Sequence, residues 1–486
     1  MTVPQQTAPA IDPHSATERA RPLPRWAQLL WRENALMQPR PWLQLAAALA
    51  LLLYGFFGIG VDAIPDKSAQ LAFLFGLIML AVYGGPAHTV SLRRSGIVWL
   101  AVAAIGVALL SWVGSWILHP HWAESSFKVH RVTGWFAMIP VAVILGGRAR
   151  NVRTLWLTAL AGLICAPWIA GGGFAEWQRG FAGERVDFGL HNAQHTAMFY
   201  GAAALGLLAF APRILRSRSD ESKASKASKA STLRTWLIRV GWVLAIAFCV
   251  TAVVLTQTRG VWLGFIVALL VLCSRWLLLL NRRFKSRRRY IFTGTLITAL
   301  LALGIGFSLF GEVIEHRLEA DRQTLTLLQR GQFDDIPYTS TGVRLHTWAE
   351  ALQWIRQRPL IGWGGNGRSL IFDHSENLPA DIRQRFGHLH NSYLDLTVNF
   401  GLLGLAVLGA LAYWLLSRTQ RYFRAGQLRS SEVSFAVSFT VFFAVINGFE
   451  SYLFYDSGRL LLAIVGGGMV TRLWAAQRRL AAGENR

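Results

Sequence analysis

The sequence predicts an all-α polytopic membrane protein with about 12 transmembrane helices and one large, partly helical periplasmic loop. The 486 residues are 53% hydrophobic and only 15% charged. Apolar runs of about 18 residues or more, the length that a helix needs to cross a bilayer, recur along the chain. Lys and Arg gather in alternate connections between these runs. The three cysteines all lie within apolar runs, so no disulfide framework or cysteine metal site is expected.

The apolar runs predict twelve spans, at about 43–61, 68–85, 95–118, 132–147, 154–173, 194–212, 236–256, 260–280, 290–311, 391–417, 432–450 and 458–475. We therefore expect five segments along the chain: a partly disordered, Pro-rich leader 1–42, nine spans in 43–311, a large loop 312–390, three spans in 391–475, and a tail 476–486.

The distribution of basic residues predicts the orientation. An even number of spans places both termini on the same side of the membrane. Eight Lys and Arg lie between Arg213 and Arg239, and seven between Arg275 and Arg289, in connections on the side of the termini. By the positive-inside rule both termini are cytoplasmic and the 312–390 loop is periplasmic. The same rule accounts for the net charge of +23 without a nucleic-acid partner.

The 312–390 loop carries two helix-like patterns. Residues 313–329 alternate apolar and charged side chains at helical spacing. Residues 341–357 form the second pattern, which Ser340 or Thr341 is expected to cap and Pro359 to stop. One face of this second helix carries Arg344, Trp348, Ala351 and Ile355. We therefore expect the loop to be folded.

His390 lies where the loop ends and an apolar run begins, within the stretch Gly387–Leu394. The first turn of a helix has unpaired N–H groups and a partial positive charge. That field disfavours imidazolium, so we expect a neutral imidazole that can accept a proton, beside a site that attracts anions. The alternative is a histidine that only caps the helix or bonds a carbonyl.

Three arginines are predicted on the same face as His390. Arg259 sits in a turn of about four residues between two apolar runs, where a charge is costly unless it faces a polar cavity or an anion. Arg185 and Arg344 lie in loops of that face. Guanidinium groups bind phosphate oxygens bidentately. The alternatives are a snorkelling interface residue for Arg259, and surface ion pairs with Glu184 and Glu350 for the other two.

Other patterns carry less chemistry. Residues 362–367 read G-x-G-x-x-G, but they follow a helix and Pro359 instead of a strand, so a tight turn is expected and not a dinucleotide site. Asp62 and Asp66 in the first outer loop are a possible base or metal ligand, or a plain turn. His191 and His195 have the i,i+4 spacing of metal ligands, but no Glu lies between them.

These motifs together resemble the O-antigen ligases, whose superfamily also holds O-antigen polymerases and bacterial protein O-oligosaccharyltransferases. His390-Asn391, followed by Gly401-x-x-Gly404, is similar to the histidine motif of the ligases. Thr258-Arg259-Gly260 resembles their arginine turn. The stretch before the histidine is similar in Arg344, Trp348, Ala351, Pro359, Gly362 and Gly364, and Arg185 resembles an arginine of the middle outer loop.

The resemblance implies a glycosyltransferase of the bacterial inner membrane that moves O-antigen polysaccharide from undecaprenyl diphosphate to a sugar hydroxyl of lipid A–core. His390 would be the catalytic base, and Arg185, Arg259 and Arg344 would hold the diphosphate. The substrate would also meet Asn391, Tyr393, His388 and Trp348. The donor already carries its leaving group and the arginines can replace a metal, so no metal or cofactor is expected. The implied partners are the lipid-linked donor, lipid A–core and membrane lipids, with no nucleic acid.

Three alternatives remain open at the level of the sequence. An O-antigen polymerase would use the same donor with another lipid-linked repeat as acceptor, although the spacing after His390 favours a ligase. A protein O-oligosaccharyltransferase would use a protein acceptor. A lipid or polysaccharide transporter is expected to keep ionisable residues near mid-membrane on broken helices. The candidate residues here gather at one face instead.

Overall fold

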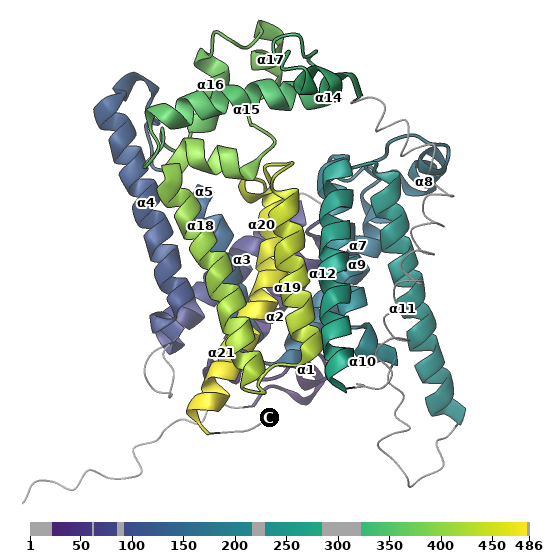
Figure 1. Cartoon of the computed structure of the whole chain (residues 1–486). Helices are drawn as coiled ribbons and strands as arrows, with labels where there is room; N and C mark the ends of the chain where they lie inside the picture. The colour runs from purple at the N-terminus through teal and green to yellow at the C-terminus, as the bar shows by residue number, and fades with distance from the viewer. Residues whose placement is uncertain (1–21, 61–62, 85–91, 216–228, 284–321, 484–486) are drawn as a thin grey trace, which may run out of the picture.

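The computed structural model describes residues 22–60, 63–84, 92–215, 229–283 and 322–483. Within these ranges the chain forms helices and no strands, which confirms the predicted all-α class. The helices form one bundle, capped at one end by α14–α17 (Figure 1). We call this the capped end. Helices α1 (Arg25–Leu30) and α10 (Ala211–Leu215) and the end of the chain lie at the opposite end.

The bundle is built from long apolar helices. Seven candidate spans in the described residues are long and apolar enough to cross a membrane: they lie in α3 (Ala63–Tyr83), α4 (Gly96–Leu118), α7 (Ala149–Ile169), α11 (Lys229–Leu255), α12 (Arg259–Arg283), α18 (Ser392–Arg424) and the region Asp456–Ala481. Shorter apolar helical segments occupy Pro41–Phe57 (α2), His130–Leu145 (α5 to α6) and Ser430–Ile446 (α19). The chain is an integral membrane protein. The predicted span 290–311 lies outside the described residues, so the count of 12 stays a prediction.

The remaining elements are short. They are η1 (Leu92–Arg94), η2 (Pro120–Trp122), α5 (His130–Thr133), η3 (Gly134–Phe136), α6 (Met138–Leu145), α8 (Gly173–Phe181) and η6 (Tyr452–Phe454). Helix α9 (Ala193–Ala209) corresponds to the predicted span 194–212 and has nearly the same bounds.

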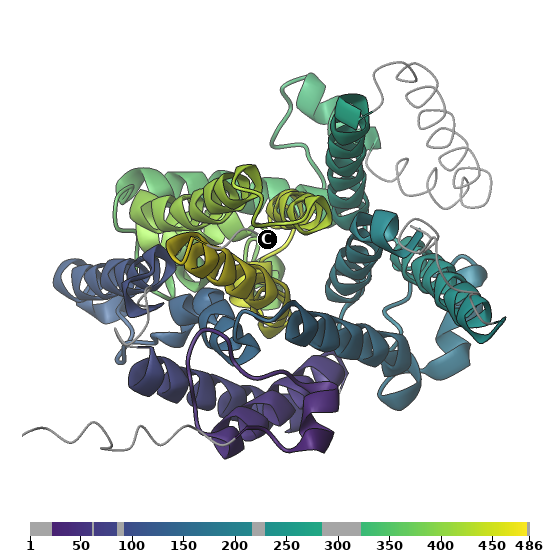
Figure 2. The same cartoon turned by 90° about the horizontal axis from the view of Figure 1, so that it is seen from below.

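The last helical region forms the centre of the bundle. Helices α20 (Asp456–Leu461) and α21 (Gly467–Ala481) are joined by a π-helical turn, η7 (Leu462–Gly466). Its best spanning window is 89% buried inside the protein, against 17–33% for the other six candidate spans. Viewed from below, this yellow element lies among the other helices (Figure 2). Gly467 allows this close packing, because a Cβ there would lie 2.5 Å from Val141 Cγ1.

The cap corresponds to the predicted 312–390 loop. It contains α14 (Arg322–Gln329), α15 (Ser340–Gln357), α16 (Gly367–His374) and α17 (Ala380–Arg385). The helix expected over 341–357 is confirmed, but Thr339 caps it, through an Oγ1 that accepts from Gly342 N at 3.3 Å. The helix expected over 313–329 is observed from residue 322, and its earlier part lies outside the described residues. A small apolar core that includes Trp354, Trp363, Ile371 and Leu389 holds the cap together.

Helix α18 is broken at Gly401, where φ is +65° and ψ is −167°. The break frees backbone groups on both sides, and the turn after α15 satisfies them. Trp363 N and Gly364 N donate to the Val398 and Asn399 carbonyls at 2.8 and 3.1 Å. Leu402 N and Leu403 N donate in return to the Pro359 and Leu360 carbonyls at 2.7 and 3.2 Å. A Cβ at Gly401 would collide with the Leu360 carbonyl, so the glycine is needed there.

Candidate active site

His390 is held immediately before helix α18. The helix begins at Ser392, and its N-cap is Asn391, whose side-chain oxygen accepts from Tyr393 N and Leu394 N at 3.0 and 3.3 Å. His390 therefore precedes the cap instead of lying in the first turn. From α15, Trp348 Nε1 donates to the Leu389 carbonyl at 2.7 Å. The half-buried His390 ring is thus placed by two elements, the start of α18 and α15.

Glu450, which follows α19, is the partner of His390. Its Oε2 lies 2.9 Å from His390 Nδ1, and its Oε1 accepts from Ser451 N at 2.9 Å and lies 3.4 Å from His388 Nε2. Burial alone raises the pKa of Glu450, but the hydrogen bonds from His388 and His390 outweigh it and hold the pKa well below its usual range. An ionised carboxylate only accepts, so His390 Nδ1 donates to it, which leaves Nε2 as the nitrogen that faces away from Glu450.

A set of buried hydrogen bonds fixes this pair across 60 residues of chain. Ser392 N donates to the Asn447 carbonyl at 2.8 Å, and Ser392 Oγ donates to Asn447 Oδ1 at 2.6 Å. Ser392 Oγ also lies 3.1 Å from the Glu450 carbonyl and accepts from Leu453 N at 3.3 Å. These bonds join the start of α18 to the loop after α19, and they set the separation between His390 and Glu450.

Arg344 reaches the same carboxylate through Gln194, at the start of α9. With the Gln194 amide nitrogen donating to Glu450 Oε2, its oxygen accepts from Arg344 Nη2 at 2.8 Å. Tyr452 Oη donates to the Gln194 carbonyl at 3.0 Å. Burial lowers the pKa of Arg344, and the Glu450 carboxylate opposes this effect. Glu350, the alternative partner of Arg344, accepts from Trp354 Nε1 and Asn377 Nδ2 instead.

Arg185 lies on the turn that leads to Arg259. Val186 N donates to the Leu255 carbonyl at 3.4 Å, and Arg185 Nε donates to the Thr256 carbonyl at 3.3 Å. Burial raises the pKa of Tyr452, and the charges of Arg344 and Arg185 both oppose that rise. Both arginines therefore lie near its phenol. Glu184, the alternative partner of Arg185, pairs with Arg179 at 2.7 Å.

Arg259 is the first residue of α12, and the elements around it are those of the site. Thr258 Oγ1 donates to the Ala193 carbonyl at 3.3 Å, next to Gln194. A Cβ at Gly260 would lie 2.7 Å from Phe449 Cβ, next to Glu450. Arg259 is half-buried. The turn that carries it is therefore packed between the start of α9 and the loop that bears Glu450.

Backbone strain coincides with the candidate residues. In the described part of the chain, three residues other than glycine have positive φ: Phe188 (+62°), Gln257 (+49°) and His390 (+50°). Each conformation costs about 1–3 kcal/mol and persists only where the surroundings impose it. One is His390 itself, and the other two lie within three residues of Arg185 and Arg259. Such strain is frequent at functional sites.

The central part of the chain matches a known protein family. Residues 243–409 match the family model described as O-antigen ligase. The central part of the chain is therefore similar to the O-antigen ligases. This ligase segment contains Arg259, Arg344 and His390, and it ends just beyond the Gly401-x-x-Gly404 motif.

One curated relative is an uncharacterized protein of Haemophilus influenzae. It is 30% identical to this chain over 168 residues, which are 34% of this chain. The match spans 39% of the length of that protein. The likeness therefore extends over about a third of the chain.

The other residues predicted to meet substrate have structural partners. Trp348 holds Leu389, Asn391 caps α18, and Tyr393 Oη donates to the Ala444 carbonyl at 2.6 Å. His388 lies at the site, where its ring nitrogens are 3.1 and 3.2 Å from Tyr455 Oη. Burial, with the Glu450 carboxylate adding to it, raises the pKa of Tyr455 to about 12. Contact of these residues with substrate stays a prediction.

The weaker sequence candidates have other contacts, although His195 packs against Tyr455 beside the site, with ring centroids 4.8 Å apart. Asp66 lies exposed in the first turn of α3, and Asp62 lies outside the described residues. His195 Nδ1 contacts Ser457 Oγ, and its ring centroid is 6.5 Å from that of His191. Residues 362–367 form the expected tight turn, with positive φ at Gly362 and Gly364.

Sequence reasoning missed Glu450 and Gln194, both outside the ligase segment. Glu450 carried a usable signal, because it is the acidic residue of a short connection, 447–455, between two apolar runs. An acidic residue at the end of a span is costly to bury without a partner. Gln194 offered no such signal, since a neutral amide after a loop is ordinary.

Proposed function

We propose that this chain is an inverting, metal-independent glycosyltransferase that moves O-antigen polysaccharide from undecaprenyl diphosphate to a sugar hydroxyl of lipid A–core. The reaction takes place on the periplasmic face of the bacterial inner membrane, at the capped end of the bundle. The observation that carries the proposal is the 2.9 Å bond between His390 Nδ1 and Glu450 within a site partly built by an O-antigen ligase segment.

The base is His390 Nε2. Glu450 accepts the Nδ1 hydrogen, which fixes the tautomer and stabilises the imidazolium that forms. The acceptor hydroxyl gives its proton to Nε2 while its oxygen attacks the anomeric carbon of the donor. The bond from that carbon to the phosphate oxygen breaks, and undecaprenyl diphosphate leaves as the anion. A direct attack from the opposite face inverts the anomeric centre. General-base catalysis of this kind contributes about 10²–10⁴ in rate.

The arginines stabilise the departing diphosphate. Arg344 is bonded to Gln194 at 2.8 Å, and Arg185 is bonded to the turn before Arg259. Both side chains are oriented by these contacts before substrate arrives. Fixed guanidinium groups aimed at developing charge lower the barrier, because they do not reorganise during the reaction. Glu450 places a negative charge beside the diphosphate, and these arginines offset it.

The proposed metal independence faces one specific alternative. His388, His390 and Glu450 offer ligand atoms that lie within 4.8 Å of one another, which is close enough for a metal ion. A metal held there would take the electron pairs that the base mechanism uses. The nearby Arg344, bridged to Glu450 by Gln194, opposes the binding of a further cation.

The alternatives differ in acceptor. An O-antigen polymerase would extend another lipid-linked repeat, and a protein O-oligosaccharyltransferase would glycosylate a pilin-like protein. A reconstitution in vesicles with the lipid-linked donor and one acceptor at a time distinguishes them. We expect transfer to lipid A–core, and transfer to only one of the other two acceptors would replace the ligase assignment.

The test of the base is His390→Ala in the full chain. We expect transfer to fall by about 10²–10⁴, while the variant still inserts and keeps its thermal unfolding profile. His121→Ala is the matched control, because His121 is exposed at the capped end and lies outside the site. Near-normal transfer by His390→Ala would remove the base assignment.

A further inference from the structure

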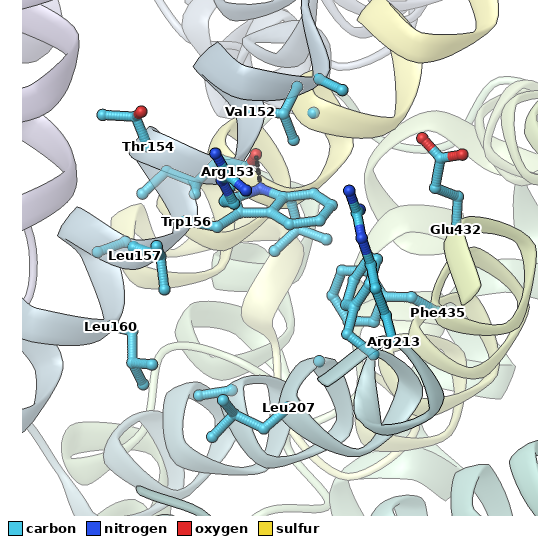
Figure 3. A pocket seen from close by; sticks show the side chains of 18 of the residues that line it. Val152, Arg153, Thr154, Trp156, Leu157, Leu160, Leu207, Arg213, Glu432 and Phe435 are labelled. Atoms are coloured by element: carbon cyan, nitrogen blue, oxygen red, sulfur yellow. Dashed lines mark hydrogen bonds between the residues drawn. The ribbon is translucent and has the colours of Figure 1, made fainter. Parts of the chain in front are cut away.

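A large cavity lies at the end of the bundle opposite His390. Its volume is about 1690 Å³, and it is bounded by α7, α9, α19, α21 and the first turns of α11. Figure 3 shows apolar side chains such as Leu160, Leu207 and Phe435 around it. Ordinary small-molecule pockets are roughly 300–1,000 Å³, so this cavity has room for a larger apolar ligand.

The cavity opens between helices that face lipid. Leu157 on α7 and Trp236 and Ile238 on α11 line it, and their side chains are 57%, 59% and 54% exposed. These positions belong to candidate spans, so the solvent that they meet is the bilayer. A ligand therefore enters sideways from the membrane and not from water.

Arginines form a collar at one end of these apolar walls. The collar consists of Arg150, Arg153, Arg213, Arg234 and Arg239. Glu432 is the acidic residue among the described lining residues, and it is already bonded to Arg472 at 2.7 Å. The collar is thus an excess of positive charge at the ends of α7, α10 and α11. Arg239 Nε is buried there without a hydrogen-bond partner in the described structure.

We propose that this cavity is a binding site for an anionic diacyl phospholipid of the adjacent leaflet. The two acyl chains lie along the apolar walls, and the phosphate-bearing headgroup contacts the arginine collar. The charge and the lateral opening select this occupant, because a basic pocket between membrane helices suits an anionic headgroup. The lipid would brace α11 against α7 and α9. The site lies at the opposite end from His390, so it stands apart from glycan transfer.

Lipid retention measures this site directly. The full chain is purified in mild detergent and exposed to equimolar phosphatidylglycerol and phosphatidylethanolamine, and bound lipid is counted by native mass spectrometry. We expect phosphatidylglycerol to be retained over phosphatidylethanolamine. Arg153→Gln/Arg213→Gln is expected to weaken its binding about 25-fold, at roughly a factor of five for each arginine.

Two further variants separate the headgroup from the chains. Arg421→Gln/Arg424→Gln removes the same charge from exposed residues of α18 outside the cavity, and it should bind lipid like the wild type. Ala203→Trp fills the apolar wall without changing charge, and it should lose the lipid. Equal loss in both arginine pairs, or equal retention of the two lipids, would show non-specific surface attraction and overturn the proposal. Competition by inorganic phosphate alone would show an anion site without a lipid.

Discussion

The carboxylate of Glu450 gives the sharpest test of the site. Glu450→Gln keeps the size of the side chain but removes the charge that accepts from His390 Nδ1 at 2.9 Å. A hydrogen bond to a charged group contributes about 1.5–3 kcal/mol, which corresponds to a factor of about 10–150 in rate. The amide can also donate to His390 and favour the wrong tautomer. We therefore expect kcat to fall by about 10²–10⁴, the full range of general-base catalysis.

The assay is initial-rate transfer from a lipid-linked donor in vesicles, measured from about pH 5 to 9. A base that has lost its carboxylate partner is less readily protonated, so the acidic limb of the kcat profile should move to lower pH. KM should change little, because Glu450 is proposed to act through His390 and not on substrate. Glu376→Gln is the control, since Glu376 is exposed in the same cap.

The same substitution has a signature in stability. The folded-state pKa of Glu450 is depressed below its ordinary value of 4.5. Its contribution to stability is therefore present above that pH and is lost as pH falls from about 4.5 through the lowered folded-state value. The thermal midpoint of the wild type should drop more steeply below pH 4.5 than that of Glu450→Gln. Full activity of the variant with an unmoved pH profile would refute the reasoning.

Three further predictions concern the supporting structure and the charges. Gly401→Ala should lower the thermal midpoint, since a backbone conformation that is essentially restricted to glycine costs alanine about 1–3 kcal/mol before its collision with Leu360. Gly409→Ala, in open space, should instead raise stability by about 0.5–1 kcal/mol. Equal midpoints would contradict the packing at the break. Arg344→Lys should lose about 10–150-fold in kcat/KM, while the exposed Arg356→Lys keeps it, and wild-type kinetics in both would leave Arg344 structural. Transfer should persist in EDTA and be inhibited by added Zn²⁺, and a loss in EDTA that Mg²⁺ restores would show a metal-dependent enzyme.

Local patterns predicted the helices well. The apolar runs anticipated α4 and α7 to within a few residues, and helical spacing anticipated α15. The cap of α15 was wrong by one residue, because Thr339, Ser340 and Thr341 are all good N-caps and only the backbone geometry selects Thr339.

Local sequence patterns could not predict which residues far apart in the chain become partners. The sequence indicated His390, but its pairing with Glu450 depends on contacts across 60 residues that Ser392 and Asn447 establish. Similarly, Gly401 was recognised as part of a motif. Its structural role, a helix break that packs against the turn after α15, depends on hydrogen bonds between residues about 40 positions apart. Periodicity carries no information on such pairings.

The broken helix α18 has a consequence for motion. A helix interrupted in mid-course is normally a hinge, but here four backbone hydrogen bonds at 2.7–3.2 Å fasten the interruption to residues 359–364. The first turns of α18 and the end of α15 must then travel as one rigid body. A substrate with a long glycan cannot be admitted by bending at Gly401. The hydrogen bonds of Ser392 also join the start of α18 to the 447–455 loop, so any opening motion must leave His390 and Glu450 paired.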